Sequence, residues 1–197
     1  VNYSIKKYPQ RWEKFIQFTT TQIDELMSHY GRIDILWLDG GWVRHLSADE
    51  IRAYLNSPGY KFTRIQSQDI NMPALAAKAR HKQPGLIIVD RAVPGPHQNY
   101  LTPENRVPEK RLPYPWESCI ISGGGWSYTR DAKYMTGREG IQLLVDIVAK
   151  GGNLLLNIAP TPEGEWQEGA YALLEEFEKW MVVNSEAIYE TKVLPPY

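Results

Sequence analysis

The sequence predicts an α/β protein in which parallel strands are covered by helices. Two observations support this prediction. Short and continuously apolar segments, such as residues 33–39 and 86–90, have the composition of strands that are buried on both faces. They alternate with segments in which apolar residues recur every three or four positions, which is the spacing of amphipathic helices. This alternation is typical of a parallel sheet with helices packed on its faces.

The first half of the chain contains three of the predicted helices. Helical spacing extends over residues 10–29, and Gly31 follows where a helix is expected to stop. The string from Ser47 to Glu50 is a capping box, and Pro73 stands where a helix begins. Together the patterns predict helices at 10–29, 47–55 and 73–82 and strands at 33–39, 60–67 and 86–90.

The second half repeats the pattern after a proline-rich segment. Residues 92–115 hold six of the chain's 14 prolines and little periodicity, so they predict a long loop of the kind that is usually functional or disordered. A second capping box, from Thr136 to Glu139, opens another helix, which Gly151 is expected to stop. The patterns predict strands at 116–122 and 154–160 and helices at 136–150 and 167–185.

The length of the chain limits the architecture. A TIM barrel needs about 250 residues and eight strand–helix units. The chain has 197 residues and supplies about half that number of units, so the pattern fits either a small open sheet or half of a barrel. No internal repeat or composition break marks a second domain, and we expect residues 1–197 to form a single segment.

The composition excludes several classes of function. Lys and Arg number 22 against 23 Asp and Glu, which gives no electrostatic reason to expect nucleic acid or an acidic membrane as a partner. No apolar run approaches the roughly 18 residues of a membrane helix. The single cysteine, Cys119, excludes an internal disulfide and a cysteine-based zinc site, and the histidines show no metal-binding spacing.

Polar side chains stand at the ends of the predicted strands, where sites form in parallel α/β proteins. Asp39 ends the first strand and Arg91 follows the second, while Glu117, Trp126 and Asn157 belong to the third and fourth strand regions. Carbohydrate cleavage uses one carboxylate as a nucleophile and a second carboxyl group as a proton donor. An aromatic ring packs on the sugar, and a guanidinium binds its hydroxyl groups.

Each of these residues also has an ordinary structural alternative. A carboxylate at a strand end is often a helix cap or a turn residue, and one in a proline-rich loop is by default a solvated surface charge. An Arg or Glu at a strand end often belongs to a structural ion pair, and Trp most often fills a core. These alternatives apply to Asp39, Glu104, Glu117, Arg91, Trp42 and Trp126.

Four strings together resemble glycoside hydrolase family 29, the retaining α-L-fucosidases. They are WLDGGW (37–42), TPENRVP (102–108), PWESC (115–119) and KGGNLLLNIAPTPEGEW (150–166). The resemblance covers nearly the whole chain, in the family's order. It implies an α/β fold that is part of a TIM-like (β/α)8 barrel, roughly strands 4 to 7 with their helices.

The resemblance also implies roles for individual residues. Asp39 in WLDGGW matches the family's nucleophile, which attacks the anomeric carbon. Glu104 in TPE resembles the acid/base, which the family carries on a mobile loop, and Glu109 and Glu117 are rivals for this role. The implied substrate-binding residues are Arg91, which contacts the fucose, Trp126, beside the methyl group on C5, and Trp42, at the leaving-group subsite.

Further expectations concern the whole protein. The implied substrate is a fucosylated oligosaccharide or glycoconjugate, cleaved with no cofactor and no metal, and the family suggests a periplasmic, secreted or lysosomal location. The family's first barrel strands and its C-terminal β-sandwich have no counterpart in this sequence. We therefore expect the chain to be an excerpt of a longer polypeptide, or to pair with a chain that supplies the rest of the barrel, and the isolated segment to be inactive and prone to aggregation.

Two competing hypotheses come from other functional classes. The first is a non-catalytic carbohydrate-binding relative that keeps the fold and the aromatic residues but has lost turnover. The second is an unrelated α/β protein in which the aspartate occurs by chance. The presence of Asp39 and of a loop glutamate favours the enzyme over the first, and the ordered strings argue against the second.

Overall fold

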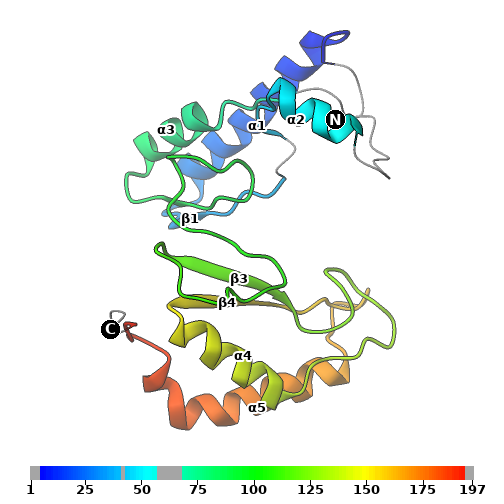
Figure 1. Ribbon diagram of the computed structural model, residues 1–197, viewed down its shortest axis with the longest axis vertical. Helices are drawn as coiled ribbons and strands as arrows, with labels where there is room; N and C mark the ends of the chain where they lie inside the picture. The colour runs from blue at the N-terminus through cyan, green and yellow to red at the C-terminus, as the bar shows by residue number, and fades with distance from the viewer. Residues whose placement is uncertain (1–4, 41–42, 57–67, 194–197) are drawn as a thin grey trace. The chain divides into compact units, whose positions relative to one another are not determined.

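A computed structural model of the chain describes residues 5–40, 43–56 and 68–193. The chain divides into two compact units, residues 1–99 and 100–197. Each unit contains a pair of parallel strands and the helices that accompany them (Figure 1). The predicted combination of parallel strands with intervening helices is thus confirmed within each unit.

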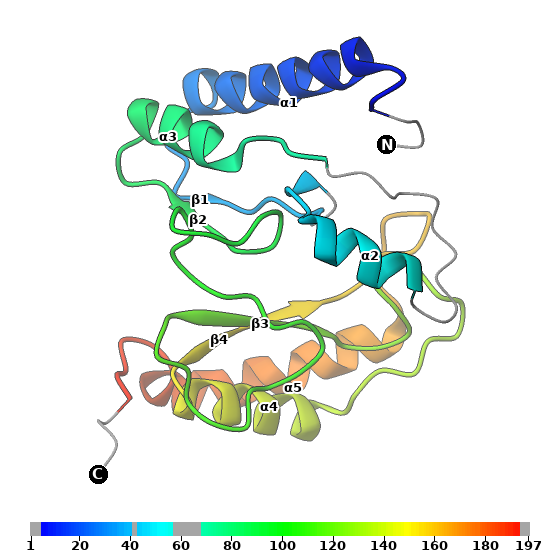
Figure 2. The ribbon, with the colours of Figure 1, turned by 45° about the horizontal axis from the view of Figure 1, so that its top comes forward.

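The described residues of the first unit form three α-helices, close to their predicted positions: α1 (Pro9–His29), α2 (Ala48–Asn56) and α3 (Met72–Lys82). Helix α1 packs against α3, as Figure 2 shows. The residues that α1 buries are Trp12, Ile23 and Met27, which recur at helical spacing. The amphipathic pattern therefore reports the face that meets α3 and the core of this unit.

Strands β1 (Ile35–Leu36) and β2 (Ile87–Ile88) pair in parallel, with Ile35 opposite Ile87. Both are shorter than the predicted segments, because apolar composition reports buried side chains whereas strand length depends on how many backbone pairs form. Beyond the ladder, Ile88 bonds to Asn99, whose N–H donates to the Ile88 carbonyl at 2.8 Å and whose Oδ1 accepts from the Ile88 N–H at 2.9 Å. The strand predicted at 60–67 lies outside the described residues.

A glutamine side chain sets the path from α1 into β1. Gln83 Nε2 donates to the carbonyl oxygens of Met27 and Gly31, both at 2.9 Å, and its Oε1 accepts from the Ile33 N–H at 2.7 Å. The Met27 carbonyl lies in the last turn of α1, where carbonyl groups lack partners within the helix, and Gly31 and Ile33 lie just beyond it. Gln83, which directly follows α3, thereby fixes where the first strand begins.

The second unit is built on β3 (Trp116–Ile121) and β4 (Gly152–Asn157), which pair in parallel over their full length. Strand β4 begins earlier than the predicted 154, directly after Gly151, whose φ of +81° ends the preceding helix as predicted. Gly152 lies opposite Trp116. A Cβ at this position would lie 2.5 Å from the indole ring, so only a glycine fits beside it. The lack of a side chain thus lets β4 start one residue after the turn.

Helices α4 (Gly137–Ala149) and α5 (Glu168–Asn184) pack against one another, and α4 packs on β4 (Figure 1). A short 3-10 turn, η2 (Ser185–Ala187), follows α5. The predicted capping box of α4 is present: Thr136 Oγ1 accepts from the Glu139 N–H at 3.2 Å, and the Glu139 carboxylate accepts from the Thr136 N–H at 2.8 Å. The Thr136 N–H and then the Thr136 hydroxyl, both donating to the carboxylate, hold the pKa of Glu139 below its usual range.

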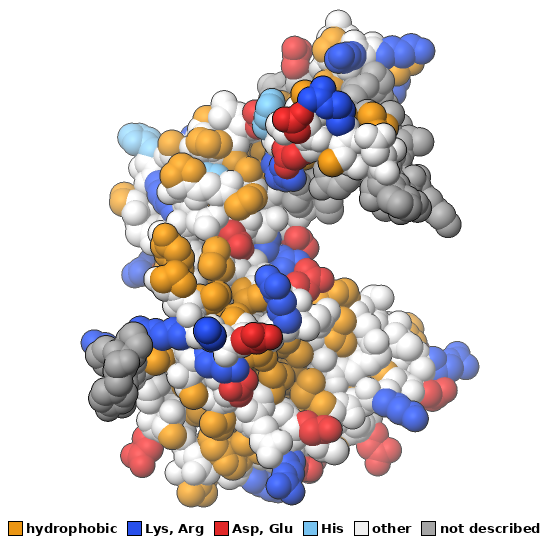
Figure 3. All heavy atoms as spheres, in the orientation of Figure 1, with side chains coloured by type: hydrophobic (Ala, Val, Ile, Leu, Met, Phe, Trp, Pro, Cys, Tyr) orange, Lys and Arg blue, Asp and Glu red, His pale blue; other side chains and the backbone are white. Residues whose placement is uncertain are grey.

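The hydrophobicity of the helices and the grouping of possible metal-ligating side chains can be stated for the described parts of the chain. None of their helices is both long and apolar enough to cross a bilayer. In the same ranges, no three His, Cys, Asp or Glu side chains gather in a way that would hold a metal ion. Acidic and basic side chains are interspersed on the face shown in Figure 3.

An ion-pair cluster links α1 to α3, and its effect on stability depends on pH. Asp24 of α1 contacts Lys82 at 2.9 Å and Lys78 at 3.2 Å, both on α3. Hydrogen bonds from Lys82 and then Lys78 lower the pKa of Asp24 in the folded protein. Its stabilising effect is therefore present above the unfolded-state pKa of about 3.9 and is lost as the pH falls through the lower folded-state value.

We expect Asp24→Asn to lower the midpoint of thermal unfolding near neutral pH, and we expect the difference from wild type to shrink below about pH 4. Thermal unfolding followed by circular dichroism over this range measures both. Asp34→Asn is the control, because the Asp34 pair with Arg32 lies within one segment and joins no helices. A difference that persists unchanged into acid would contradict the assignment.

Candidate active site

Asp39 and Arg91 come together in the first unit, beyond the carboxyl ends of β1 and β2. Arg91 Nε donates to Asp39 Oδ1 at 3.3 Å, and the same oxygen accepts from the Gly40 N–H at 2.9 Å. The two side chains differ in exposure: that of Arg91 is 13% exposed and that of Asp39 is 63% exposed. The pair thus consists of an anchored guanidinium and an accessible carboxylate.

Trp37 holds the guanidinium in place. The Arg91 guanidinium carbon lies 4.8 Å from the centre of the Trp37 ring, within the range of a cation–π interaction. Trp37 is not among the predicted site residues. The period of two in an extended segment places Trp37 and Asp39 on the same side of the chain, and this spacing is the sequence signal that could have identified it.

The structure addresses the alternative in which Asp39 is a helix cap. Helix α2 is capped by Ser47, whose Oγ accepts from the Glu50 N–H at 3.2 Å while the Glu50 carboxylate accepts from the Ser47 N–H at 2.9 Å. This is the predicted capping box, and it leaves no capping role at α2 for Asp39. Trp42, the predicted leaving-group residue, lies outside the described residues.

Glu104 lies in the second unit, in a segment that runs parallel to β3. The Leu101 carbonyl accepts from the Glu117 N–H at 2.9 Å, and the Pro103 carbonyl accepts from the Cys119 N–H at 3.1 Å. Glu104 itself forms a parallel bridge with Cys119. The segment is outside regular strands, as predicted for a loop, but its backbone is fixed to β3 by a ladder that spacing alone does not reveal.

Asn105 ends this ladder. Its N–H donates to the Cys119 carbonyl at 2.8 Å, and its Oδ1 accepts from the Ile121 N–H at 3.1 Å, in the place of a backbone carbonyl. Its φ of +49° turns the chain away from β3. Asn tolerates this left-handed conformation better than most residues, so Asn105 both continues the ladder and releases the chain directly after Glu104.

The two rivals of Glu104 occupy different surroundings. Glu117 lies within β3, opposite Asn153 of β4, and is half-buried. Residues paired in a ladder share a face, and so do residues two apart in a strand, so Glu104 and Glu117 lie on the same face of this sheet. Glu109 is exposed beyond the ladder. The register therefore places Glu104 and Glu117 on one face, while Glu109 lies outside the ladder.

Trp126 lies in the loop after β3 and is 43% exposed. Asn157, the last residue of β4, donates from Nδ2 to the carbonyl oxygens of Gly125 at 3.3 Å and Trp126 at 3.4 Å. The loop thus lies at the carboxyl ends of β3 and β4, where the sequence predicts the site. The indole ring is available to a ligand at this end of the strands.

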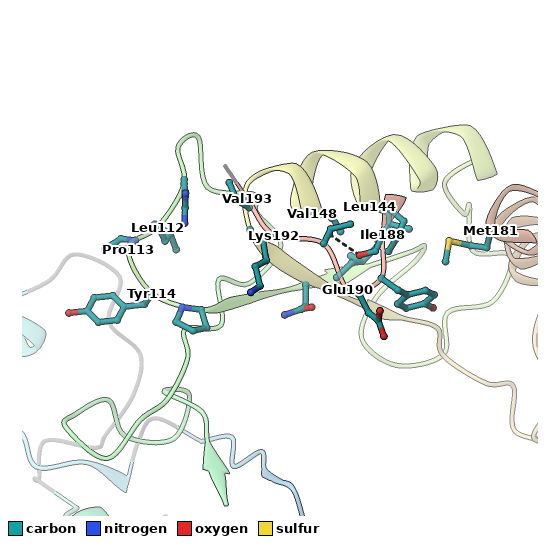
Figure 4. Close-up of a pocket in the computed structure, with 18 of the residues that line it drawn as sticks. Leu112, Pro113, Tyr114, Leu144, Val148, Met181, Ile188, Glu190, Lys192 and Val193 are labelled. Atoms are coloured by element: carbon teal, nitrogen blue, oxygen red, sulfur yellow. Dashed lines mark hydrogen bonds between the residues drawn. The ribbon is translucent and has the colours of Figure 1, made fainter. Parts of the chain in front are cut away.

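A cavity of about 880 Å³ opens at the opposite, amino end of the same strands. It is lined by the start of β4, by the segment before β3 and by the C-terminal segment (Figure 4). In Figure 4, Leu144 and Val148 of α4 lie beside Ile188, and Glu190 and Lys192 come from the C-terminal segment. None of the predicted site residues lines this cavity, so its volume does not mark the candidate site.

Comparisons with known proteins identify the family of the chain. A family model described as Alpha-L-fucosidase matches residues 2–186. The chain belongs to the alpha-L-fucosidase family. The plasma alpha-L-fucosidase of Pongo abelii is 30% identical over 182 residues, which cover 88% of this chain and 35% of that protein. The chain thus spans about a third of the length of this family member.

Solved alpha-L-fucosidase structures share the fold. The Thermotoga maritima alpha-fucosidase in complex with fucose matches with a TM-score of 0.67 and 26% identity, over 92% of this chain and 36% of that chain. Alpha-L-fucosidase isoenzyme 1 from Paenibacillus thiaminolyticus matches with a TM-score of 0.75 and 24% identity, over 93% of this chain and 42% of that chain. The chain is thus a mixed α/β segment that matches part of alpha-L-fucosidase structures.

The double role of Asn105 can be tested by stability measurements. Asn105→Ala introduces the steric cost of the left-handed conformation and removes the acceptor for Ile121, and we expect it to cost about 1–3 kcal/mol of unfolding free energy. Asn105→Gly removes only the acceptor, and Asn105→Asp keeps it. We therefore expect the loss of unfolding free energy to be largest for Asn105→Ala, smaller for Asn105→Gly and smallest for Asn105→Asp. Urea unfolding measures the series, and equal costs for Ala and Gly would contradict the conformational part.

Proposed function

We propose that the protein hydrolyses terminal α-L-fucosyl residues by a retaining double displacement, with Asp39 as the nucleophile. The observation that supports this is the accessible Asp39 carboxylate beside the anchored Arg91 guanidinium at the carboxyl ends of β1 and β2. A nucleophilic carboxylate must carry its charge, and a guanidinium is a favourable neighbour for that charge. Family membership supplies the reaction class to which this arrangement is suited.

We also propose that strands β1 to β4 correspond roughly to strands 4 to 7 of a TIM-like barrel, with residues 1–197 as one segment of it. The match of the chain to 36% of the Thermotoga maritima protein supports a partial barrel. The missing strands would come from the rest of the barrel, so the activity belongs to the whole protein. The isolated segment is expected to be inactive.

The first chemical step forms a covalent intermediate. An Asp39 carboxylate oxygen attacks the anomeric carbon of the fucosyl group, the bond from that carbon to the leaving oxygen breaks, and Glu104 gives its proton to this oxygen. The products are a fucosyl ester of Asp39 and the released alcohol or sugar. In retaining enzymes the two carboxyl groups are about 5–5.5 Å apart during this step.

The second step uses water. Glu104, now a carboxylate, takes a proton from a water molecule whose oxygen attacks the anomeric carbon, and the bond to Asp39 breaks. Two inversions leave the configuration of the fucose unchanged. Carboxyl groups and water account for every proton and electron pair, so the proposed reaction uses no metal or cofactor.

Three further side chains are proposed to bind the sugar. Arg91 presents planar N–H donors that suit the hydroxyl groups of a fucose. Trp126 offers an exposed indole face to the apolar side of the ring near its methyl group. Trp42 is proposed to border the leaving-group subsite. The substrate is a fucosylated oligosaccharide or glycoconjugate, whose fucose these groups would recognise.

The nucleophile can be identified by trapping. We expect 2-deoxy-2-fluoro-fucosyl fluoride to label the intact protein on the peptide that contains Asp39. The fluorine on C2 slows both steps, while the good fluoride leaving group keeps the first step fast enough for the intermediate to accumulate. Mass spectrometry of the digested protein locates the label. Asp39→Asn should abolish both labelling and turnover, whereas Asp34→Asn, at the opposite end of the same strand region, should preserve both. An intact protein that binds fucose without labelling or turnover would support the non-catalytic relative instead.

The acid/base can be identified by chemical rescue. Glu104→Ala should lose most of its activity on an aryl α-L-fucoside with a good leaving group, and azide should restore turnover by replacing water in the second step. The expected product is a fucosyl azide, detectable by chromatography. Glu109→Ala and Glu117→Ala serve as matched comparisons. Rescue of Glu117→Ala without rescue of Glu104→Ala would assign the role to Glu117.

A further inference from the structure

The position of Trp126 is set by its backbone. Its side chain is 43% exposed, so the loop and not a packed core determines where the indole lies. The loop begins at Ser122, which is buried, and returns at Met135, whose N–H donates to the Ser122 carbonyl at 2.8 Å. The contacts that fix the loop backbone between Ser122 and Met135 therefore also determine the orientation of the Trp126 indole.

Asn157 holds the near side of the loop with groups from both its side chain and its backbone. Its Nδ2 donates to the carbonyl oxygens of Gly125 and Trp126. Its own carbonyl accepts from the Ser122 N–H at 3.1 Å and from Ser122 Oγ at 2.6 Å. A single residue at the end of β4 thus fixes both the end of β3 and the residue that carries the indole.

The far side of the loop is held separately. Gln167 Nε2 donates to the Thr129 carbonyl at 2.8 Å, and its Oε1 accepts from the Ala132 N–H at 3.2 Å. Near the start of the loop, a Cβ on Gly123 would lie 2.7 Å from Tyr134 Cα, so the two ends of the loop approach as closely as a glycine allows. The two ends of the loop therefore lie against one another. Among the hydrogen bonds of the described residues, only that from Asn157 reaches the backbone of Trp126.

We propose that Asn157 is a positioning residue, which sets the Trp126 indole against the apolar face of the sugar. The inference rests on the proposed function, because it assumes that Trp126 contacts the substrate. Asn157 acts through the backbone of Trp126 and needs no contact with the sugar. Its loss should therefore weaken binding through Trp126 and through nothing else.

A double-mutant cycle tests this dependence. Asn157→Asp keeps the shape of the side chain but turns its donor into a carboxylate that repels the two carbonyl oxygens. We expect kcat/KM of the intact protein for an aryl α-L-fucoside to fall about 10-fold, mostly through KM. This is less than the roughly 100-fold that a 1 Å misplacement of reacting groups can cost, because Trp126 is proposed to bind the sugar and takes no part in bond breaking. In a Trp126→Ala background the same substitution should change kcat/KM by less than about 2-fold. If Asn157→Asp lowers kcat/KM by the same factor in the Trp126→Ala background as in the wild type, the proposal is overturned.

Control variants separate positioning from folding. Asn153→Ala removes an amide side chain at the other end of β4 without adding a carboxylate opposite Glu117, and it should leave kcat/KM at the wild-type value. Asn157→Ala removes the donor without adding a charge, and it replaces Asn157→Asp in the cycle if that variant fails to fold. The Ser122 N–H and hydroxyl both donate to the backbone carbonyl of residue 157, so we expect these two bonds to remain in every variant.

A spectroscopic measurement keeps the proposal independent of turnover. The indole N–H resonance of Trp126, assigned with a Trp126→Phe variant, should shift in Asn157→Ala and stay in place in Asn153→Ala. An unshifted resonance would overturn the positioning role. If the wild-type protein does not cleave the aryl fucoside, the proposed function fails, while the resonance still decides whether Asn157 positions Trp126.

Discussion

Hydrogen bonds along both edges of β3 (Trp116–Ile121) are the constraint on which the second unit depends. One edge pairs with β4, and the other bonds to the backbone of residues 101–105. A strand held on both sides cannot slip by one residue, because a slip would move every side chain to the opposite face. Glu104 and Glu117 therefore stay on one face. The fixed end of β3 also places the loop that follows it within hydrogen-bonding distance of Asn157.

In the first unit, the corresponding constraint acts on the Arg91 side chain. Arg91 is mostly buried, and the ring of Trp37 fixes its guanidinium, while its partner Asp39 stays accessible. The segment after Arg91 is tied back by Arg80, whose Nη2 donates to the His97 carbonyl at 2.7 Å and whose Nε donates to the Leu86 carbonyl at 3.2 Å. In both units a fixed part of the chain thus holds an exposed carboxylate, Asp39 beside Arg91 and Glu104 on the ladder with β3. Fixed placement of this kind is what catalytic groups need.

The two ends of the strands in the second unit serve different purposes. The amino end opens into the cavity near Leu144 and Val148, and the carboxyl end carries the loop of Trp126. In parallel α/β proteins the loops at the carboxyl ends gather the functional groups, while the amino ends contribute mainly to stability. The cavity marks the amino end, whereas strand direction points to the carboxyl end, where Asn157 and Trp126 lie.

The sequence by itself determined the helices, both capping boxes, the parallel strands and the family, because these depend on residues a few positions apart or on strings that can be compared directly. It also named Asp39, Arg91 and Glu104 as site residues, and their catalytic roles remain predictions. Only the tertiary structure decided the extent of the strands, the ladder that fixes Glu104, the ring beneath Arg91 and the reach of Asn157 to Trp126. Such contacts join groups far apart in the chain, and local spacing carries no record of which backbone groups will meet.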